Sequence, residues 1–288
     1  MKEVVVLSGK GGTGKTSIVG AFAALAKHKV LSDCDVDAAD LHLLLSPTTV
    51  EEHEFWSGQV AVIDPELCTL CGLCEEACRF DAIHDFAVGR VGCEGCGLCA
   101  RICPVGAITM RENLAGHWFV SETRFGPLVH AKLGIAQENS GKLVHLVRQK
   151  AKETAEHAGL GVTINDGPPG IGCAVISSLS GASLACIVTE PSVSGIHDME
   201  RVLQVCRHFS VPALVCVNKY DINEEGTHQV EQYCEGQAVE VVAKIPFDVR
   251  FTEAQVQGVS IVEYTDDARI VGPVDAAWRA VSERLDAA

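Results

Sequence analysis

The sequence predicts an α/β protein with a doubly wound, mostly parallel sheet, into which a smaller α+β domain is inserted. Three observations support this prediction. Short apolar segments alternate with helical segments along most of the 288 residues, an order that builds a parallel sheet covered by helices. Polar motifs follow several apolar segments, at the strand ends where ligands bind in such sheets. Between residues 57 and 115 the alternation stops, and eight cysteines occur there.

Composition limits the classes of protein to which the chain can belong. Hydrophobic residues make up 47% and charged residues 21%, as in a soluble globular protein. No apolar run approaches the roughly 20 residues of a membrane span, and the N-terminus shows no signal peptide, so we expect a cytoplasmic location. The net charge of −15 argues against electrostatic binding of nucleic acid or anionic lipid. We therefore expect no nucleic-acid partner and no membrane association.

The first polar motif is a glycine loop between an apolar segment at residues 4–7 and a helix expected at residues 17–27. It fits the phosphate-binding pattern G-x-x-x-x-G-K-[ST] at every fixed position. Loop N–H groups would converge on the nucleotide phosphates at the positive end of the helix. The lysine would neutralise phosphate oxygens, and the threonine hydroxyl would bind Mg²⁺. An ordinary glycine-rich turn is the alternative. The expected nucleotide-binding residues are Gly9, Lys10, Gly11, Gly12, Thr13, Gly14, Lys15, Thr16 and Ser17.

Two acidic motifs follow later apolar segments. Asp33 and Asp35 follow one expected strand, and Asp166 ends another before a stiff Pro-Pro-Gly turn. Carboxylates at these strand ends lie beside the phosphate loop in doubly wound sheets, where they orient water or hold Mg²⁺ through its hydration shell. We expect Asp33 and Asp166 to join the threonine in holding Mg²⁺, and Gly170 to offer its N–H to the γ-phosphate. A solvated acidic turn is the alternative for Asp33 and Asp35.

Lys10 places a second lysine at the start of the loop, which reads K-G-G-x-G-K-[TS]. This loop and the D-x-P-P-G at Asp166 resemble the MinD/ParA/Mrp and nitrogenase iron protein superfamily of P-loop ATPases. The resemblance implies an ATP-dependent homodimer in which Lys10 reaches the nucleotide of the partner and Asp35 positions the attacking water. It implies catalytic roles for Lys10, Lys15, Asp35 and Asp166, and contacts of the adenine with Asn218 and with backbone groups around Pro246.

Eight of the 14 cysteines form two runs with the same spacing, C-x2-C-x2-C-x3-C. This is the signature of two-cluster bacterial ferredoxins, in which the fourth cysteine of each run ligates the other cluster. We therefore expect two [4Fe–4S] clusters, and a pair of zinc sites is the alternative. One cluster is assigned to Cys68, Cys71, Cys74 and Cys103, and the other to Cys78, Cys93, Cys96 and Cys99.

The expected domains follow from these motifs. A ferredoxin domain at residues 57–115 interrupts an ATPase domain formed by residues 1–56 and 116–288. The main sheet is expected to resume after the insert, with β segments at residues 116–120 and 124–133.

Cys173 lies outside the two cysteine runs, seven residues after Asp166. In the resembled family, the nitrogenase iron protein has its switch cysteine at this distance, where it helps to hold a cluster shared by two subunits. Two hypotheses remain open for Cys173. It is either a small buried or reactive thiol, or it holds a cluster or metal transiently together with Cys173 of a second copy.

Together the motifs imply an iron–sulfur ATPase, and three functions compete. The first is a nucleotide-gated dimeric switch, with slow and partner-stimulated hydrolysis, that delivers electrons to a partner protein. The second is an ATPase that assembles or inserts a metal–sulfur cluster in a client protein. The third is a positioning ATPase of the MinD/ParA kind, against which the acidic charge counts. The chain has no C-terminal C-x-x-C, a motif usual in Mrp-type cluster carriers, so we favour the first.

Overall fold

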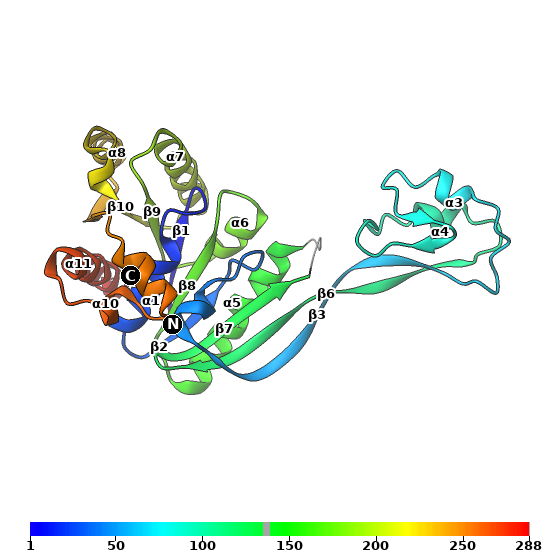
Figure 1. Cartoon of the computed structure of the whole chain (residues 1–288), viewed down its shortest axis with the longest axis horizontal. Helices are drawn as coiled ribbons and strands as arrows, with labels where there is room; N and C mark the ends of the chain where they lie inside the picture. Colours follow the sequence, from blue (N-terminus) through cyan, green and yellow to red (C-terminus); the bar gives the residue numbers. More distant parts are fainter. Residues whose placement is uncertain (135–138, 288) are drawn as a thin grey trace. The chain divides into compact units, whose positions relative to one another are not determined.

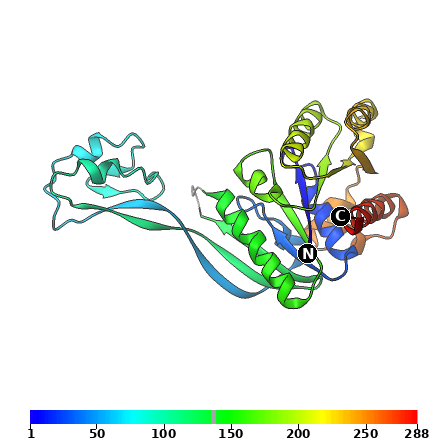
Figure 2. The ribbon, with the colours of Figure 1, turned by 180° about the vertical axis from the view of Figure 1, so that it is seen from behind.

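The computed structural model describes residues 1–134 and 139–287. Its main sheet has the strand order β11-β10-β9-β1-β8-β2-β7-β6-β3 (Figures 1 and 2). The pairing from β11 to β7 is parallel throughout, which confirms the mostly parallel α/β fold. The strands of this sheet are β1 Lys2–Ser8, β2 Lys29–Asp33, β3 Thr48–Ile63, β6 Ile108–Thr123, β7 Gly126–Leu133, β8 Val162–Pro169, β9 Leu184–Thr189, β10 Ala213–Asn218 and β11 Glu240–Ile245.

Helices cover both faces of the parallel part of the sheet. Strand β1 has apolar side chains on both faces, so both need cover. Val4 and Val6 lie in one core and Val5 and Leu7 in the opposite one, since successive side chains of a strand point to opposite faces. Helices α1, α2, α10 and α11 pack on the first core, and α6, α7 and α8 pack on the second. The helices outside the cysteine region are α1 Lys15–Leu25, α2 Leu41–Leu45, α5 Ser140–Ala158, α6 Cys173–Leu179, α7 Val193–His208, the 3₁₀ helix η1 Tyr220–Ile222, α8 Glu224–Gly236, α9 Arg250–Val256, α10 Ile261–Tyr264 and α11 Ala268–Ala287.

The chain divides into two compact units. The first contains Met1–Glu52, Phe119–Ala131 and Ser140–Ala288, and the second contains His53–Trp118 and Lys132–Asn139. The second unit holds all eight cysteines of the two runs, the short helices α3 Leu73–Glu76 and α4 Leu98–Ile102, and the paired strands β4 Ile83–His84 and β5 Ala87–Val88. The assignment of these units as an ATPase domain and a ferredoxin domain stays a prediction.

Two strands differ from the prediction. The expected β segment at residues 116–120 lies within the longer β6, Ile108–Thr123, and β3 was not predicted. Residues 48–54 of β3 are exposed on both faces. They therefore lack the apolar alternation that identifies a half-buried strand. Within the described ranges, no helix is both long and apolar enough to cross a membrane.

Candidate nucleotide site and cysteine hollows

The glycine loop lies between β1 and α1, as the sequence predicted. Gly14 has φ +89° and directly precedes α1, and a Cβ at this position would overlap the side-chain amide of Asn218. A cavity of about 580 Å³ opens above the loop. Its lining includes the loop from Gly11 to Ser17 together with Asp35, Pro168, Pro169 and Cys173. The structure therefore brings the loop and both predicted acidic regions to one cavity.

Lys15 is the charged centre of this cavity. It is buried and ion-paired with Asp166 Oδ1, and its Nζ lies 3.9 Å from Asp35 Oδ2. Burial alone would lower the pKa of Lys15, but the attraction of Asp166 and its neighbours outweighs it, so the pKa is raised. The other oxygen of Asp166 is buried without a hydrogen-bond partner among the described residues. A free carboxylate oxygen beside the phosphate loop fits a water of hydrated Mg²⁺.

Asp35 faces the same cavity and has a perturbed carboxyl group. Burial raises its pKa to about 6, and Asp166 and Asp37 add to this effect although Lys15 opposes it. Such a group changes its charge close to neutral pH, as residues that act on water or protons often do.

Asp33 has a different position from the one expected for a Mg²⁺ ligand. Its carboxyl group is fully buried and accepts the N–H groups of Asp35 and Leu41, each at 3.1 Å. Burial and the nearby Asp166 raise the pKa of Asp33 well above its ordinary value. Asp33 therefore shapes the loop that carries Asp35, and its contact with Mg²⁺ stays a prediction.

Lys10 is held by groups of its own chain. Its Nζ lies 2.6 Å from Glu190 Oε1 and donates to Ser192 Oγ at 3.1 Å and Ser194 Oγ at 3.0 Å. Glu190 also pairs with Lys219 at 3.3 Å. Burial would raise the pKa of Glu190, but the two lysines outweigh this effect and lower it. Sequence reasoning missed Glu190, although it follows β9 as Asp35 follows β2 and so showed the same signal.

The residues expected near the γ-phosphate and the base have partners within the protein. Gly170 has φ +87°, and its N–H donates to Ser8 O at 2.9 Å. Its contact with a phosphate therefore needs a change of partner in this turn. Asn218 Nδ2 donates to Thr13 O at 2.7 Å. Asn218 and Pro246 line a second cavity of about 160 Å³, which shares Gly12, Gly14, Ser17 and Gln255 with the first.

Cys173 begins α6 and is exposed beside the phosphate cavity. The hypothesis that Cys173 is a small buried thiol is therefore wrong. Its position leaves two hypotheses, a reactive thiol and the transient holding of a cluster or metal together with Cys173 of a second copy.

The eight clustered cysteines line two hollows in the second unit. The same four residues that the sequence assigned to each cluster meet in each hollow. The two runs repeat one backbone pattern, in which Gly72 with φ +78° and Gly97 with φ +72° precede the short helices. At the fourth cysteine of each run, a backbone N–H points to sulfur, from Ala82 to Cys78 at 3.4 Å and from Ala107 to Cys103 at 3.3 Å.

The chemistry of these hollows fits an iron–sulfur cluster. Four thiols and N–H donors to sulfur are what a [4Fe–4S] cluster requires. The buried core here is very small and is formed by Ala61, Cys74, Ile83 and Ile108. A core of this size usually needs further support from disulfides, a metal centre or oligomerisation. In the described part of the chain, no group of three or more His, Cys, Asp or Glu residues is placed so that it could hold a single metal ion. Cluster binding therefore stays a prediction.

Comparisons with known proteins agree on the fold. The model of the CobQ/CobB/MinD/ParA nucleotide binding domain matches residues 4–261. An uncharacterized protein of Methanocaldococcus jannaschii is 34% identical over 224 residues, which are 77% of this chain and 79% of the relative. An iron-sulfur cluster carrier protein of Pyrococcus abyssi is 25% identical over 306 residues, covering 98% of this chain and 85% of the relative.

Solved structures show the same fold at lower identity. The septum site-determining protein MinD of Pyrococcus horikoshii, complexed with Mg-ADP, superposes with a TM-score of 0.61 and 18% identity, over 98% of this chain and 96% of that one. The cell division ATPase MinD of Pyrococcus furiosus superposes with a TM-score of 0.59 and 19% identity, over 98% of each chain. Because the family model spans most of the sequence and the phosphate loop has the geometry it requires, the chain belongs to the CobQ/CobB/MinD/ParA family of nucleotide-binding proteins.

Proposed function

We propose that the chain is an ATP-hydrolysing iron–sulfur protein that works as a nucleotide-gated dimeric switch and delivers electrons to a partner protein. One observation carries this proposal. The same chain contains a phosphate cavity with Lys15, Asp35 and Asp166 and two hollows, each lined by four cysteines. In this proposal, residues 1–56 and 116–288 form the ATPase domain and residues 57–115 the ferredoxin domain.

The charges of the cavity suggest how nucleotide binding changes the protein. The phosphates of ATP compete with Asp166 for Lys15, so Asp166 can turn both oxygens to the water shell of Mg²⁺, which Thr16 also contacts. Asp35, which is ionised above about pH 6, orients the attacking water. Loss of the γ-phosphate removes these contacts, and the loops after β2 and β8 return to their earlier positions.

A homodimer of the ATP state is supported by the surface around the phosphate loop. Val193, Phe247 and Val249 are exposed large apolar residues in segments that begin at the ends of β9 and β11, the edge of the sheet at which the loop follows β1. Large apolar side chains exposed beside a polar site favour a protein partner. In the dimer, Lys10 leaves Glu190 and binds the nucleotide of the other copy.

The hollows would hold the redox groups. Cys68, Cys71, Cys74 and Cys103 would hold one [4Fe–4S] cluster, and Cys78, Cys93, Cys96 and Cys99 the other. Bound clusters would supply one-electron transfer. The N–H groups of Ala82 and Ala107 donate to the sulfur atoms of Cys78 and Cys103, and such hydrogen bonds would raise the reduction potential of a bound cluster.

A second function is favoured by the names of the Pyrococcus relatives, which are iron-sulfur cluster carrier proteins. Here the chain would use ATP to supply a cluster to a client. The two proposals differ in one measurable property, because an electron carrier keeps its clusters during turnover and a cluster donor loses them to the acceptor.

The test uses anaerobically purified protein that has been reduced and then mixed with a one-electron acceptor protein. The rate of oxidation is measured with MgATP, with MgADP and without nucleotide, and Lys15→Ala serves as the variant that cannot respond to ATP. We expect the rate to change several-fold with MgATP in the wild type only. Equal rates in all three conditions would contradict gating. Transfer of iron to an apo-acceptor in the same mixture would favour the cluster donor.

A further inference from the structure

The first cysteine run carries leucines at two positions where the second run carries glycines. The residue before the first cysteine is Leu67 in one run and Gly92 in the other, and the residue before the second cysteine is Leu70 or Gly95. The cysteine spacing is the same in both runs, so the ligand pattern does not require these leucines. The first hollow is the one lined by Cys68, Cys71, Cys74 and Cys103, and the second is lined by Cys78, Cys93, Cys96 and Cys99.

The two glycines of the second run lie against other parts of the same unit. A Cβ on Gly95 would lie 2.3 Å from the carbonyl oxygen of Gln59 on β3, so no side chain fits there. A Cβ on Gly92 would lie 3.4 Å from the Cβ of Ala82. The chain itself therefore covers the second run at both positions.

The leucines of the first run face solvent instead. Leu67 is 54% exposed and Leu70 is 63% exposed. Leu73 and Val105, each 45% exposed, line the first hollow. Large apolar side chains that are exposed together beside a site mark a surface that another molecule covers.

Leu70 also has an unfavourable backbone conformation. Its φ of +55° lies in the left-handed region, which a bulky side chain rarely adopts, whereas Gly95 has φ +63° at the same position of the second run without this cost. Leu70 lies between Thr69 and Cys71, which both line the first hollow. A strained and exposed leucine contributes little to packing within the unit, so strain at this place indicates a role at the surface.

The charge around the two runs differs as well. Residues 53–78 contain no lysine or arginine, whereas residues 79–103 contain three arginines and three acids. Asp64, Glu66 and Glu76, in the segment that carries the exposed leucines, are exposed carboxylates. Such a surface attracts a partner with positive charges, and two copies of it repel each other.

We propose that Leu67, Leu70, Leu73 and Val105, the first-hollow face, dock the electron-accepting partner. The partner is a redox protein whose contact surface has an apolar centre and a rim of lysines and arginines. One electron passes across this face, so that the cluster of the first hollow is oxidised and the redox centre of the partner is reduced. This inference rests on the proposed electron delivery and names the side on which the electron leaves.

The test uses cytochrome c, a small basic haem protein, as the probe. The same protein with its lysines succinylated is the acidic counterpart. Wild type that carries both clusters is reduced anaerobically, and the second-order rate of cytochrome c reduction is measured with MgATP at low and at high ionic strength. We expect the native probe to react faster than the succinylated one, and the difference to shrink as salt screens the charges.

Leu73 and Leu98 are a matched pair of positions. Each begins the short helix after the glycine of its run, and they are 45% and 42% exposed at the first and second hollow. Leu73→Ala should lower the rate with native cytochrome c about 3- to 10-fold, the loss expected for an apolar side chain within an interface. Leu98→Ala should leave the rate unchanged. Both variants should keep the iron content of the wild type.

Leu70→Gly separates docking from folding. Glycine adopts the left-handed conformation without strain, so this variant should unfold at the same urea concentration as the wild type or at a higher one. Its rate with native cytochrome c should nevertheless fall, because the exposed side chain is lost. An unchanged rate in Leu70→Gly and Leu73→Ala would overturn the inference.

Carbodiimide cross-linking maps the face without electron transfer, because it joins carboxylates of the chain to lysines of the probe. Within the second unit, cross-links should fall on Asp64, Glu66 and Glu76 rather than on Asp81, Asp85 and Glu94. Cross-links at the latter three, or equal losses of rate in Leu73→Ala and Leu98→Ala, would overturn the inference and leave electron delivery intact. A change in the sedimentation of the chain alone in Leu73→Ala would assign the face to a second copy and also overturn it. If wild type with both clusters reduces neither probe, the proposed function fails instead.

Discussion

Lys10 Nζ lies 2.6 Å from Glu190 Oε1 within one chain. Two serine hydroxyls accept its remaining N–H donors, so the ammonium group is fully hydrogen-bonded without a nucleotide. For Lys10 to reach the nucleotide of a second copy, these contacts must break. In the proposed dimer, the Glu190 pair therefore opposes association, and its strength sets how much free energy ATP binding must contribute.

The first prediction concerns this pair. Glu190→Gln, in an Asp35→Ala background that slows hydrolysis, should lower the dimer dissociation constant with MgATP by about 3- to 10-fold, since a partly exposed ion pair contributes about 1 kcal/mol. Analytical ultracentrifugation measures the constant. Glu231→Gln, which removes an exposed pair with Lys244 at 2.8 Å, is the matched control. A dimer dissociation constant that is unchanged or higher in Glu190→Gln would show that Glu190 does not restrain Lys10.

The second prediction concerns the pH dependence of hydrolysis. The pKa of Asp35 is raised to about 6, chiefly by burial, and in the proposed mechanism its ionised form orients the attacking water. The value of kcat/KM should therefore be constant above about pH 7 and fall about ten-fold per pH unit below the pKa. Because Asp37 raises the pKa of Asp35, Asp37→Asn should move the inflection to lower pH. A flat profile from pH 5 to 8 would show that Asp35 has no such role.

The third prediction tests which cysteines share a cluster. Because Cys74 and Cys103 line one hollow and Cys78 lines the other, the double variant Cys74→Ser/Cys103→Ser should keep about four irons per chain. Cys74→Ser/Cys78→Ser should lose both clusters. Iron analysis and EPR of the reduced protein distinguish these outcomes. The opposite pattern would mean that each run holds its own cluster.

The fourth prediction concerns stability. Glu3 and Arg148 form a buried ion pair, with contacts of 2.7 and 2.8 Å, that joins β1 to α5. Arg148→Met leaves the buried Glu3 carboxylate paired with the partly exposed Lys152 alone among the described cations, so it should lower the free energy of unfolding by about 3 kcal/mol, the lower end of what breaking a buried pair costs. Urea unfolding followed by circular dichroism measures the loss. Glu153→Gln, at an exposed pair with Lys150, should cost less than about 1 kcal/mol.

The same pair sets a dependence of stability on pH. Burial would raise the pKa of Glu3, but Arg148 and Lys152 outweigh it and lower the pKa. The stabilisation is therefore complete above the unfolded-state pKa of glutamate and is lost as the pH falls through the lower folded-state value. If Arg148→Met lowered the free energy of unfolding no more than the Glu153→Gln control, a stabilising role for the buried pair would be contradicted.

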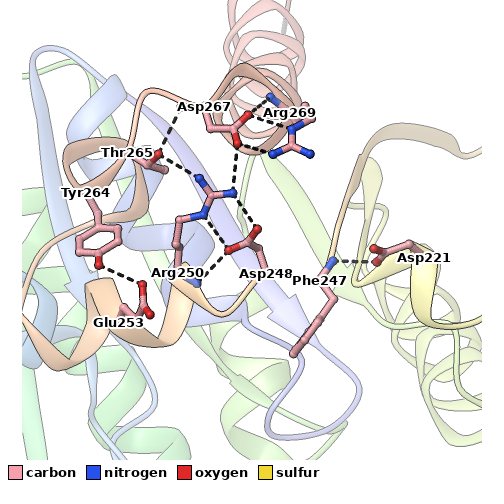
Figure 3. Close-up of polar contacts among 9 residues, drawn as sticks. All are labelled: Asp221, Phe247, Asp248, Arg250, Glu253, Tyr264, Thr265, Asp267 and Arg269. Carbon is pink, nitrogen blue, oxygen red and sulfur yellow. Dashed lines mark hydrogen bonds and ion pairs between the residues drawn. The ribbon is translucent and has the colours of Figure 1, made fainter.

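The sequence predicted the features that depend on neighbouring residues. The phosphate loop, the strand-end carboxylates and the cysteine spacing are local patterns, and the structure places Lys15 beside Asp166 and Asp35 as those patterns indicated. The sequence did not predict contacts between loops that are far apart in the chain, such as those of Lys10 with Glu190 and of Asp221 with Phe247, the second of which Figure 3 shows. Strand β3 was not predicted because its exposed first half lacks the alternation of apolar and polar residues that identifies a half-buried strand.

The most direct test of the central claim is the metal and nucleotide content of one anaerobic preparation of the wild type. Iron, acid-labile sulfide and zinc are measured per chain, and MgATP binding is measured on the same sample. The account predicts about eight irons and eight sulfides in protein that also binds MgATP. Zinc in place of iron, or no affinity for adenine nucleotides, would contradict it.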